Sequence, residues 1–532
     1  MSDVSETKPT LSLRDTVAFI AMCCGMYMAL VNIQIVNSSF KEIQGGLAAG
    51  PDQVSWVLTA ALIAEVIMIP LSGWLSRLAS TRWLFSACTG AFALASLGCA
   101  NAWNIESMIV FRALQGFSGG ALMPLVFATV YTVYPAKKQT RVMTIVSFCA
   151  VTSMAVGPTV GGWITEILSW QWLFLISVPI ALILMVLSAT LIDFDKPETD
   201  LARHIDYAGI ALAAICVITL LVVLEEGRRQ DWFESGTIIT LAVVSAVSGY
   251  LFLWRELTCR HPVVDLRVFR NRDFALGCFY ISVFGAVLYI PLFLLPLYLA
   301  RVRAIDTFEI GTIVVVLGCS MIASTPIAGA MLRYMRRRTT LLIGFVGLAI
   351  GTWMQGQLTA EYGFAELVLP QVVRGLASQI CWLSVVTLAL SPIPTDQVKN
   401  ASALFNLVMR LGAAVAIALA NSAIEVLGRV HYARIAETVT AGQAAAASVL
   451  PRMSGIFHGI YGDSPTADQA GLAVLIATVE REALIRSFNQ VTQATAVICL
   501  VSLVMLPLLR GRGSMVARKP GPPPPTSDSA PK

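Results

Sequence analysis

The sequence predicts an all-α, polytopic membrane protein with fourteen spanning helices, arranged as two six-helix halves around a central helix pair. Its composition, the length of its apolar runs and an internal repeat predict this architecture. Of the 532 residues, 56% are hydrophobic and only 13% are charged, whereas soluble domains carry about 25% charged residues. The apolar runs are roughly 20 residues long, enough for a helix to cross a hydrocarbon core about 30 Å thick. A helix also satisfies its own backbone hydrogen bonds in lipid, so each run is expected to be a helix.

In chain order, the expected spans are 17–39, 54–75, 83–103, 105–133, 141–167, 171–191, 206–224, 236–255, 274–299, 308–331, 340–358, 364–390, 399–427 and 488–510. The first run is too long for a signal peptide and lacks a small-residue cleavage site, so it is expected to remain as a span. Lys and Arg concentrate in alternate loops, which predicts that both termini are cytoplasmic. These basic loops fit topology and lipid contact better than nucleic-acid binding.

The cysteines and histidines indicate neither disulfides nor metal. Ten of the eleven cysteines lie inside apolar runs, where they behave as small packing residues. The Cys and His residues have no metal-ligand spacing, and we expect no cofactor. Ser/His/Asp and Cys/His groupings that share one bilayer depth are also missing from the sequence, so an enzyme is not expected.

The chain repeats itself. The segment 70–77, PLSGWLSR, closes the second expected span, and 326–333, PIAGAMLR, closes the tenth. Further on, Arg112-Ala-Leu-Gln-Gly116 is echoed by Arg374-Gly-Leu-Ala-Ser378. Duplicated helical halves are typical of transporters. The expected organisation is a six-helix bundle over 1–199, two inserted helices over 200–257, a second six-helix bundle over 258–510 and a disordered cytoplasmic tail over 511–532.

The second bundle is expected to include an outer loop over 428–487. Within it, residues 468–488 have apolar residues at helical spacing. The segment is either an amphipathic helix leading into the last span or a plain connector.

Two glycine-rich stretches mark the fourth and fifth expected spans. Gly116 and Gly120 are four residues apart, so they clear one helix face for another backbone. In the fifth span, Gly157, Gly161 and Gly162 offer a similar face, and Pro158 removes a backbone donor. Arg112 is costly in hydrocarbon, by roughly 2.5–3.5 kcal/mol. It therefore either faces a polar cavity or snorkels and binds carbonyls.

These motifs together resemble the major facilitator superfamily, specifically its drug:proton antiporters with fourteen spans, the EmrB-type exporters. The residues that carry the resemblance are GWLSRLASTR (73–82), RALQG (112–116), GPTVGG (157–162), ALVNIQIVNSSF (29–40) and FNLVMRLGAAVAIAL (405–419). The resemblance implies two bundles of the major facilitator type with a central cavity, and the GPTVGG motif is the part that the family associates with antiport. The residues expected to form the conformational motif are Gly73, Arg77, Gly116, Gly120, Gly157, Pro158, Gly161 and Gly162.

The chain departs from the family pattern at two charged positions. Arg77 occupies the position where the family's inner loop usually has an aspartate, which puts a charge relay there in doubt. Asn32 stands where the first span of the family usually has an aspartate, and an amide does not ionise in the ordinary pH range.

Glu65 is the one carboxylate near the middle of an expected span. At 1.5 Å per residue it lies about 16 Å from either end of its helix. Removing a carboxylate from water favours its protonated form, so Glu65, with Arg112 and Asn32, is the expected proton-coupling group. In the alternative, Asn32 or Arg112 neutralises Glu65, which then only packs helices.

Other polar residues fall in spans that line the cavity in the resembled fold, and hydrogen-bonded helix packing is their alternative role. The expected cavity residues are Gln34, Asn37, Gln115, Gln371, Arg374, Gln379, Asn406 and Arg410. Three arginines against one glutamate predict a positive cavity, which favours anionic or weak-acid amphiphiles over cations.

The expected function is a proton-coupled efflux antiporter for hydrophobic or amphiphilic small molecules, such as drugs and weak organic acids, in a bacterial inner membrane. An organic-anion uptake symporter and a membrane sensor that does not transport are the alternatives. The expected partners are the substrate, protons and lipid. The resemblance adds a periplasmic adaptor, docked on the 428–487 loop, and an outer-membrane channel.

Overall fold

The protein is a bundle of long helices in a computed structural model. The structure describes residues 12–198, 206–259, 264–303, 307–438 and 464–509, with positions 262, 305 and 457. The first half contains α1 Leu13–Ser38, α2 Phe40–Gly46, α3 Pro51–Leu78, α4 Ser80–Ala100, α5 Ile105–Gly119, α6 Leu122–Val133, α7 Ala136–Ile167, α8 Trp172–Leu175 and α9 Ser177–Leu191. The remaining elements are α10 Tyr207–Glu226, η2 Trp232–Glu234, α11 Gly236–Thr258, η3 Leu266–Arg270, α12 Arg272–Val302, α13 Thr307–Tyr334, α14 Arg337–Gln355, α15 Phe364–Leu390, α16 Val398–Thr438, α18 Ser464–Ser502 and η4 Leu503–Leu508.

Each of the fourteen expected spans coincides with helix in the structure. Within the described residues, twelve helices are long and apolar enough to cross a membrane. Helices α7 and α14 are outside this set, and both begin with charged residues, at 136–141 and 337–338. The fourth span is divided into α5 and α6 at Gly120 and Ala121, next to the glycine pair.

Local sequence explains where several helices begin. Ser12 caps α1, because its hydroxyl accepts a hydrogen bond from the Asp15 amide at 3.1 Å, and the Asp15 carboxylate accepts one from the Ser12 amide at 3.0 Å. Asn104 caps α5 in the same way through the Ser107 amide at 2.8 Å. Pro51 occupies the first turn of α3, where a missing N–H costs nothing.

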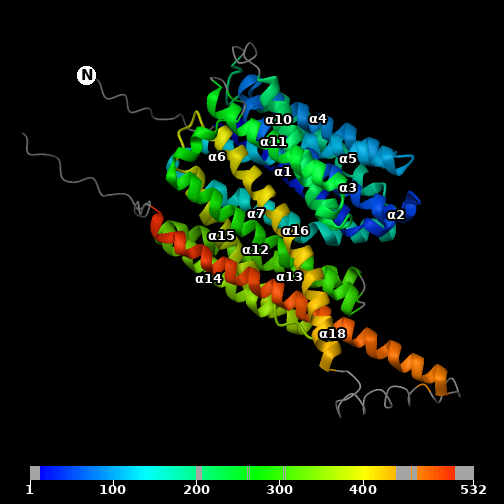
Figure 1. Ribbon diagram of the computed structural model, residues 1–532. Coiled ribbons are helices and arrows are strands. Elements are labelled where there is room, and N and C mark those ends of the chain that lie inside the picture. The colour runs from blue at the N-terminus through cyan, green and yellow to red at the C-terminus, as the bar shows by residue number, and fades with distance from the viewer. Residues whose placement is uncertain are drawn as a thin grey trace, which may run out of the picture.

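The two halves lie side by side, with the N-terminal helices in blue and cyan and the C-terminal helices in green to red (Figure 1). Within the first half, α1 packs against α7 and α9, and α3 packs against α5. Within the second half, α15 packs against α13 and α14, and α12 packs against α16. Between the halves, α3 contacts α16 and α7 contacts α13. Since the repeat equates α3 with α13, these two interfaces are related by the duplication.

The inserted pair, α10 and α11, packs together and lies along the seam between the halves. Helix α10 contacts both α3 and α16. Its buried Val217 and Leu221 join Ile63 and Val66 of α3 in one apolar cluster. Most of α11 faces outward. Helix α10 is therefore an additional wall at the α3–α16 seam.

Much of the segment expected to be an outer loop is helical. Helix α16 continues to Thr438, and α18 begins at Ser464 and runs without interruption into the last span. Of the two interpretations of 468–488, the structure has the helix. The orange part of α18 leaves the bundle in Figure 1, and His431 of α16 bonds Gln490 of α18 at 2.9 Å. The expected disordered tail, 511–532, lies outside the described residues.

Candidate functional site

A cavity of about 540 Å³ lies between the two halves. Helices α1, α3, α4, α5, α6 and α7 line it from the first half, α12, α13, α15 and α16 line it from the second, and α10 closes one side. The lining extends to Arg228 and Arg229, in the turn that follows α10. The cavity therefore reaches the end of the bundle opposite to both expected cytoplasmic termini.

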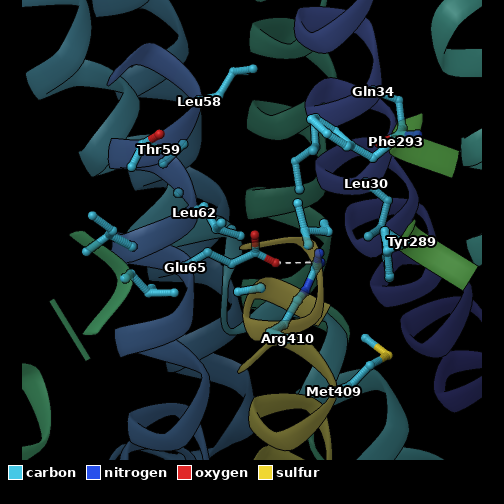
Figure 2. Close-up of a pocket in the computed structure, with 18 of the residues that line it drawn as sticks. Leu30, Gln34, Leu58, Thr59, Leu62, Glu65, Tyr289, Phe293, Met409 and Arg410 are labelled. Atoms are coloured by element: carbon cyan, nitrogen blue, oxygen red, sulfur yellow. Dashed lines mark hydrogen bonds and ion pairs between the residues drawn. The ribbon is translucent and has the colours of Figure 1, made fainter. Parts of the chain in front are cut away.

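Glu65 of α3 and Arg410 of α16 form an ion pair across the cavity. Their Oε1 and Nη2 atoms are 2.7 Å apart, and the two side chains are only 12% and 13% exposed. Figure 2 shows the pair facing each other, with Leu30, Gln34, Tyr289 and Phe293 on the other side of the space. Because α3 and α16 belong to different halves, this contact joins the two parts of the molecule. The expected neutralising partners of Glu65 were Asn32 and Arg112, and the observed partner is Arg410.

Arg112 lies deeper and binds only neutral acceptors. Its Nε donates to the Val57 carbonyl at 3.2 Å, and its Nη1 donates to Asn32 Oδ1 at 3.3 Å and Gln115 Oε1 at 2.6 Å. The Gln115 amide in turn donates to Ser96 Oγ at 2.7 Å, which fixes its orientation. Arg112 is 2% exposed and lines the cavity. Among the described residues, no carboxylate forms an ion pair with it.

Arg374 is the counterpart of Arg112 in the second half, but it is sealed from the cavity. Its Nη1 donates to Gln355 Oε1 and, at 3.1 Å, to Gln371 Oε1, while Nη2 donates to the Leu288 carbonyl at 3.3 Å. It is fully buried and is not part of the cavity lining.

The expected cavity residues divide into two groups. Gln34, Gln115 and Arg410 line the cavity, as do Asn32, Glu65 and Arg112. The side chain of Asn37 lies outside the described side chains. Four of the expected residues do not line the cavity in this conformation: Gln371, Arg374, Gln379 and Asn406. The helices around them enclose their side chains. The positive charge expected from three arginines is therefore reduced, since Arg374 is excluded and Arg410 is neutralised by Glu65.

Sequence reasoning missed the charged end of α10 and the aromatic wall of the second half. Glu225, Glu226, Arg228 and Arg229 contribute to the lining, and Glu226 pairs with Arg229 at 2.9 Å. The signal available was the sequence EEGRR at 225–229, which follows directly after the expected span 206–224. Its place at the cavity depends on the packing of the inserted helix, which hydropathy does not specify.

Trp382 forms the aromatic floor of the cavity. Its ring lies 6.0 Å from that of Phe127, 5.8 Å from that of Phe284 and 6.5 Å from that of Phe405, measured between centroids. Phe127 belongs to α6 of the first half, so these aromatic contacts cross between the halves.

The glycine pair brings α3 close to α5. A Cβ on Gly116 would lie 2.1 Å from the Ala61 carbonyl oxygen, and a Cβ on Gly120 would lie 2.6 Å from that of Glu65. The backbone that carries Glu65 therefore rests on Gly120, as close packing at small residues allows. Gly157 similarly abuts Gln34, whose Cβ would be 2.3 Å from an added Cβ.

Two glycines of the fifth-span motif are placed differently. A Cβ on Gly162 would meet no atom within 4 Å, so this glycine does not form the expected close-packing face. Gly161 is buried, and its carbonyl accepts a hydrogen bond from the Thr165 hydroxyl at 3.0 Å. The side chain of Pro158 lies outside the described side chains.

At the opposite end from the cavity mouth, a second ion pair joins the two halves. Lys399 of α16 donates to the Asp195 carboxylate and, at 3.1 Å, to the Ser76 carbonyl of α3. Asp195 also accepts from the Thr81 backbone amide at 3.0 Å. A Cβ on Gly73 would lie 3.1 Å from the Lys399 carbonyl oxygen, so α3 and α16 touch there.

Arg77 does not take part in that contact. It pairs with Glu198 at 3.0 Å on the surface, where both side chains are well exposed. The acid that contacts the second half comes instead from Asp195, in the segment after α9. Arg77 replaces the aspartate of the resembled pattern, and Asp195 supplies a carboxylate at the same end of the molecule.

Comparison with known proteins gives a consistent family. Residues 17–417 match the model described as Major Facilitator Superfamily. The chain is 32% identical to the colistin resistance protein EmrB of Acinetobacter baumannii, over 93% of this chain and 96% of that protein. It is 28% identical to the multidrug export protein EmrB of Escherichia coli K12, over 94% and 96%. It is 27% identical to the fatty acid resistance protein FarB of Neisseria gonorrhoeae, over 91% and 94%.

Solved structures share the fold at low identity. The human organic anion transporter MFSD10 matches with a TM-score of 0.56 and 11% identity, over 92% of this chain and 100% of that chain. The proton:xylose symporter XylE matches with a TM-score of 0.58 and 14% identity, over 93% and 96%. These two likenesses concern the arrangement of helices.

Proposed function

This chain belongs to the Major Facilitator Superfamily and is a membrane transporter related to multidrug exporters, and we propose that it is a proton-coupled antiporter exporting amphiphilic small molecules by alternating access. The observation that supports this best is the Glu65–Arg410 ion pair, because it places an ionisable carboxylate inside the cavity and across the seam between the halves. Of the three expected coupling residues, Glu65 alone exchanges a proton readily, since Asn32 is an amide and arginine stays charged in proteins.

The proposed cycle begins from the conformation described here. With both termini cytoplasmic, as the basic loops predict, the cavity opens outward and the Lys399–Asp195 contact closes the cytoplasmic end. Protonation of Glu65 from outside removes its charge and releases Arg410, which loosens α3 from α16. The halves then rock so that the cavity opens inward, where Glu65 loses its proton and substrate enters. A ligand or proton drives such a cycle only through its different affinity for the two states.

The proposed location is a bacterial inner membrane. The related EmrB and FarB proteins suggest that the substrates are small molecules. The helical extension formed by α16 and α18 projects on the outer side in the proposed orientation, and we assign it to docking of a periplasmic adaptor that connects to an outer-membrane channel. Leu472 and Ile476, both exposed apolar residues of this extension, suit such a contact.

Everted membrane vesicles with an acidic interior test the coupling. Wild-type vesicles should accumulate a dansyl-labelled undecanoate or ethidium, used as acidic and cationic probes. Glu65→Gln should abolish gradient-driven accumulation, because glutamine carries no exchangeable proton, while probe binding to the purified protein persists. Glu65→Asp should retain partial activity.

The matched control is Glu425→Gln, which removes a carboxylate from the same helix that carries Arg410, at an exposed site outside the cavity. It should transport like wild type. Accumulation by Glu65→Gln at the wild-type level would refute the assignment of Glu65. Accumulation only in right-side-out vesicles would favour the alternative, an organic-anion uptake symporter, for which the unneutralised Arg112 is the supporting observation.

A further inference from the structure

Arg112 carries a positive charge with no ion-pair partner among the described residues, and the nearby carboxylate of Glu65 is in direct contact with Arg410 instead. Its acceptors are one backbone carbonyl and two side-chain amides, from Val57, Asn32 and Gln115. Of the other cationic groups that line the cavity, Arg410 pairs with Glu65, Arg229 pairs with Glu226, and Arg228 is exposed to solvent in the turn after α10. A charged group in a low-dielectric site is expensive without a counter-charge. Arg112 is therefore the position where an anion gains most.

One edge of the Arg112 guanidinium is open to the cavity. Its Nε and Nη1 atoms are engaged, whereas Nη2 has no hydrogen-bond partner in the described part of the chain. Nη2 is also not among the enclosed polar atoms that lack a partner. Arg112 lines the cavity, and with Nε and Nη1 engaged, Nη2 is the guanidinium nitrogen that is left to face it. The three bonds to α1, α3 and α5 hold the guanidinium in place, so little side-chain entropy remains to be lost on binding.

The wall next to Arg112 is apolar. Gly119, two turns along α5, packs against Phe92 and Ala29, with an added Cβ 3.4 Å and 3.8 Å from their side chains. Met26, Leu30 and Met123 continue this lining, and Trp382 and Phe284 face it from the second half. A volume of about 540 Å³ is ordinary for a small-molecule site. The cavity thus combines one fixed cation with a long hydrocarbon-like surface.

We propose that Arg112 binds the anionic head group of the substrate, and that the substrate class is carboxylate-bearing amphiphiles whose apolar tail lies along α1, α4 and α6. This rests on the proposed export function. It assigns to Arg112 a role in substrate recognition rather than in proton coupling. Asn32 is the residue that makes this role available, because an aspartate there would neutralise Arg112 from within.

Binding of octanoate to the purified protein in lipid nanodiscs tests this proposal. Radiolabelled octanoate should bind wild type, and unlabelled octanoate should displace it at least tenfold more effectively than octanol or octyltrimethylammonium, which have the same tail. A charge-assisted hydrogen bond to a carboxylate accounts for a factor of this size.

Asn32→Asp is the decisive variant, because it keeps Arg112 and changes the volume of residue 32 very little. It should weaken octanoate binding about tenfold or more and leave octanol binding unchanged. Arg112→Gln should have the same effect, and Arg374→Gln, at the sealed counterpart, should not. Variants are compared only where size-exclusion chromatography shows a folded protein, and Asn32→Asp remains the test if Arg112→Gln does not fold.

Octanoate binding by Asn32→Asp at wild-type strength would overturn the proposal, as would equal displacement by the acid and the ammonium compound. This assay uses no gradient, so it is independent of the coupling test. If vesicles accumulate ethidium but octanoate fails to bind, the export function stands and the carboxylate assignment falls. If octanoate binds and vesicles fail to accumulate either probe, the carboxylate assignment stands and the export function falls.

Discussion

The two halves place an arginine at equivalent positions of equivalent helices, Arg112 in α5 and Arg374 in α15, yet give them different surroundings. Both arginines donate to a glutamine three residues away on their own helix and to a backbone carbonyl of a neighbouring helix. Arg112 keeps an edge toward the cavity, whereas Arg374 is enclosed by α12 and α14. The two arginines therefore have the same kinds of acceptor, although the glutamine follows Arg112 and precedes Arg374, but they do not have the same exposure. The first half is the one that presents a charge to the cavity.

The largest expected effect on stability comes from replacing the enclosed arginine, Arg374. Arg374→Met leaves oxygens of Gln355, Gln371 and Leu288 without donors in a dry site, and each such loss costs about 1–3 kcal/mol. Arg112→Met should cost less, because cavity water can reach the acceptors it leaves. Thermal unfolding of the two variants in the same detergent measures this, with a clearly larger drop in Tm for Arg374→Met. Equal drops would mean that the two arginines are equally enclosed.

A smaller effect on stability should follow from loosening the contact between α3 and α5, which positions the Val57 carbonyl beside Arg112. Gly116→Ala puts a methyl group 2.1 Å from the Ala61 carbonyl oxygen, so α3 must move away from α5 and carry the Val57 carbonyl away from Arg112. Overpacking of this kind costs about 1–3 kcal/mol. The matched control is Gly162→Ala, which meets no atom within 4 Å. The Tm should fall for Gly116→Ala and stay unchanged for the control, and the opposite ranking would contradict the observed packing.

The smallest expected effect concerns the contact that joins the halves away from the cavity. The Lys399 and Asp195 side chains are 14% and 20% exposed, so water still screens their pair, which contributes up to about 1 kcal/mol. Lys399→Met should raise access from the cytoplasmic side up to about fivefold. Alkylation of Ser402→Cys by a membrane-impermeant maleimide, in a background without other reactive cysteines, measures this access, because Ser402 bonds the Pro124 carbonyl across the same seam. Lys399→Arg should retain the closed state, and unchanged alkylation in Lys399→Met would show that the contact does not hold the halves together.

The sequence was sufficient to locate the helices and some of the charged groups, but it did not predict which charged groups form ion pairs. All fourteen expected spans coincide with helix, twelve of them long and apolar enough to cross a membrane within the described residues, and a carboxylate isolated at mid-span identifies Glu65. Its partner, Arg410, is 345 residues away, and the pairing depends on how α3 and α16 are tilted and rotated. Hydropathy leaves tilt and rotation open because packing against neighbouring helices sets them. The same gap explains why Arg374 and Gln379 were expected in the cavity and are enclosed instead.

Helix α16 carries one further consequence through its length. Its 41 residues correspond to about 62 Å at 1.5 Å per residue, roughly twice the thickness of a hydrocarbon core. The same continuous rod holds Arg410 at the ion pair and ends far beyond the bilayer surface. A tilt of about 5° around the ion pair displaces the far end, about 40 Å away, by about 3.5 Å. In the proposed cycle, a protein docked on that end experiences each turnover as a mechanical movement, so the state of the cavity is transmitted along the helix without any chemical messenger.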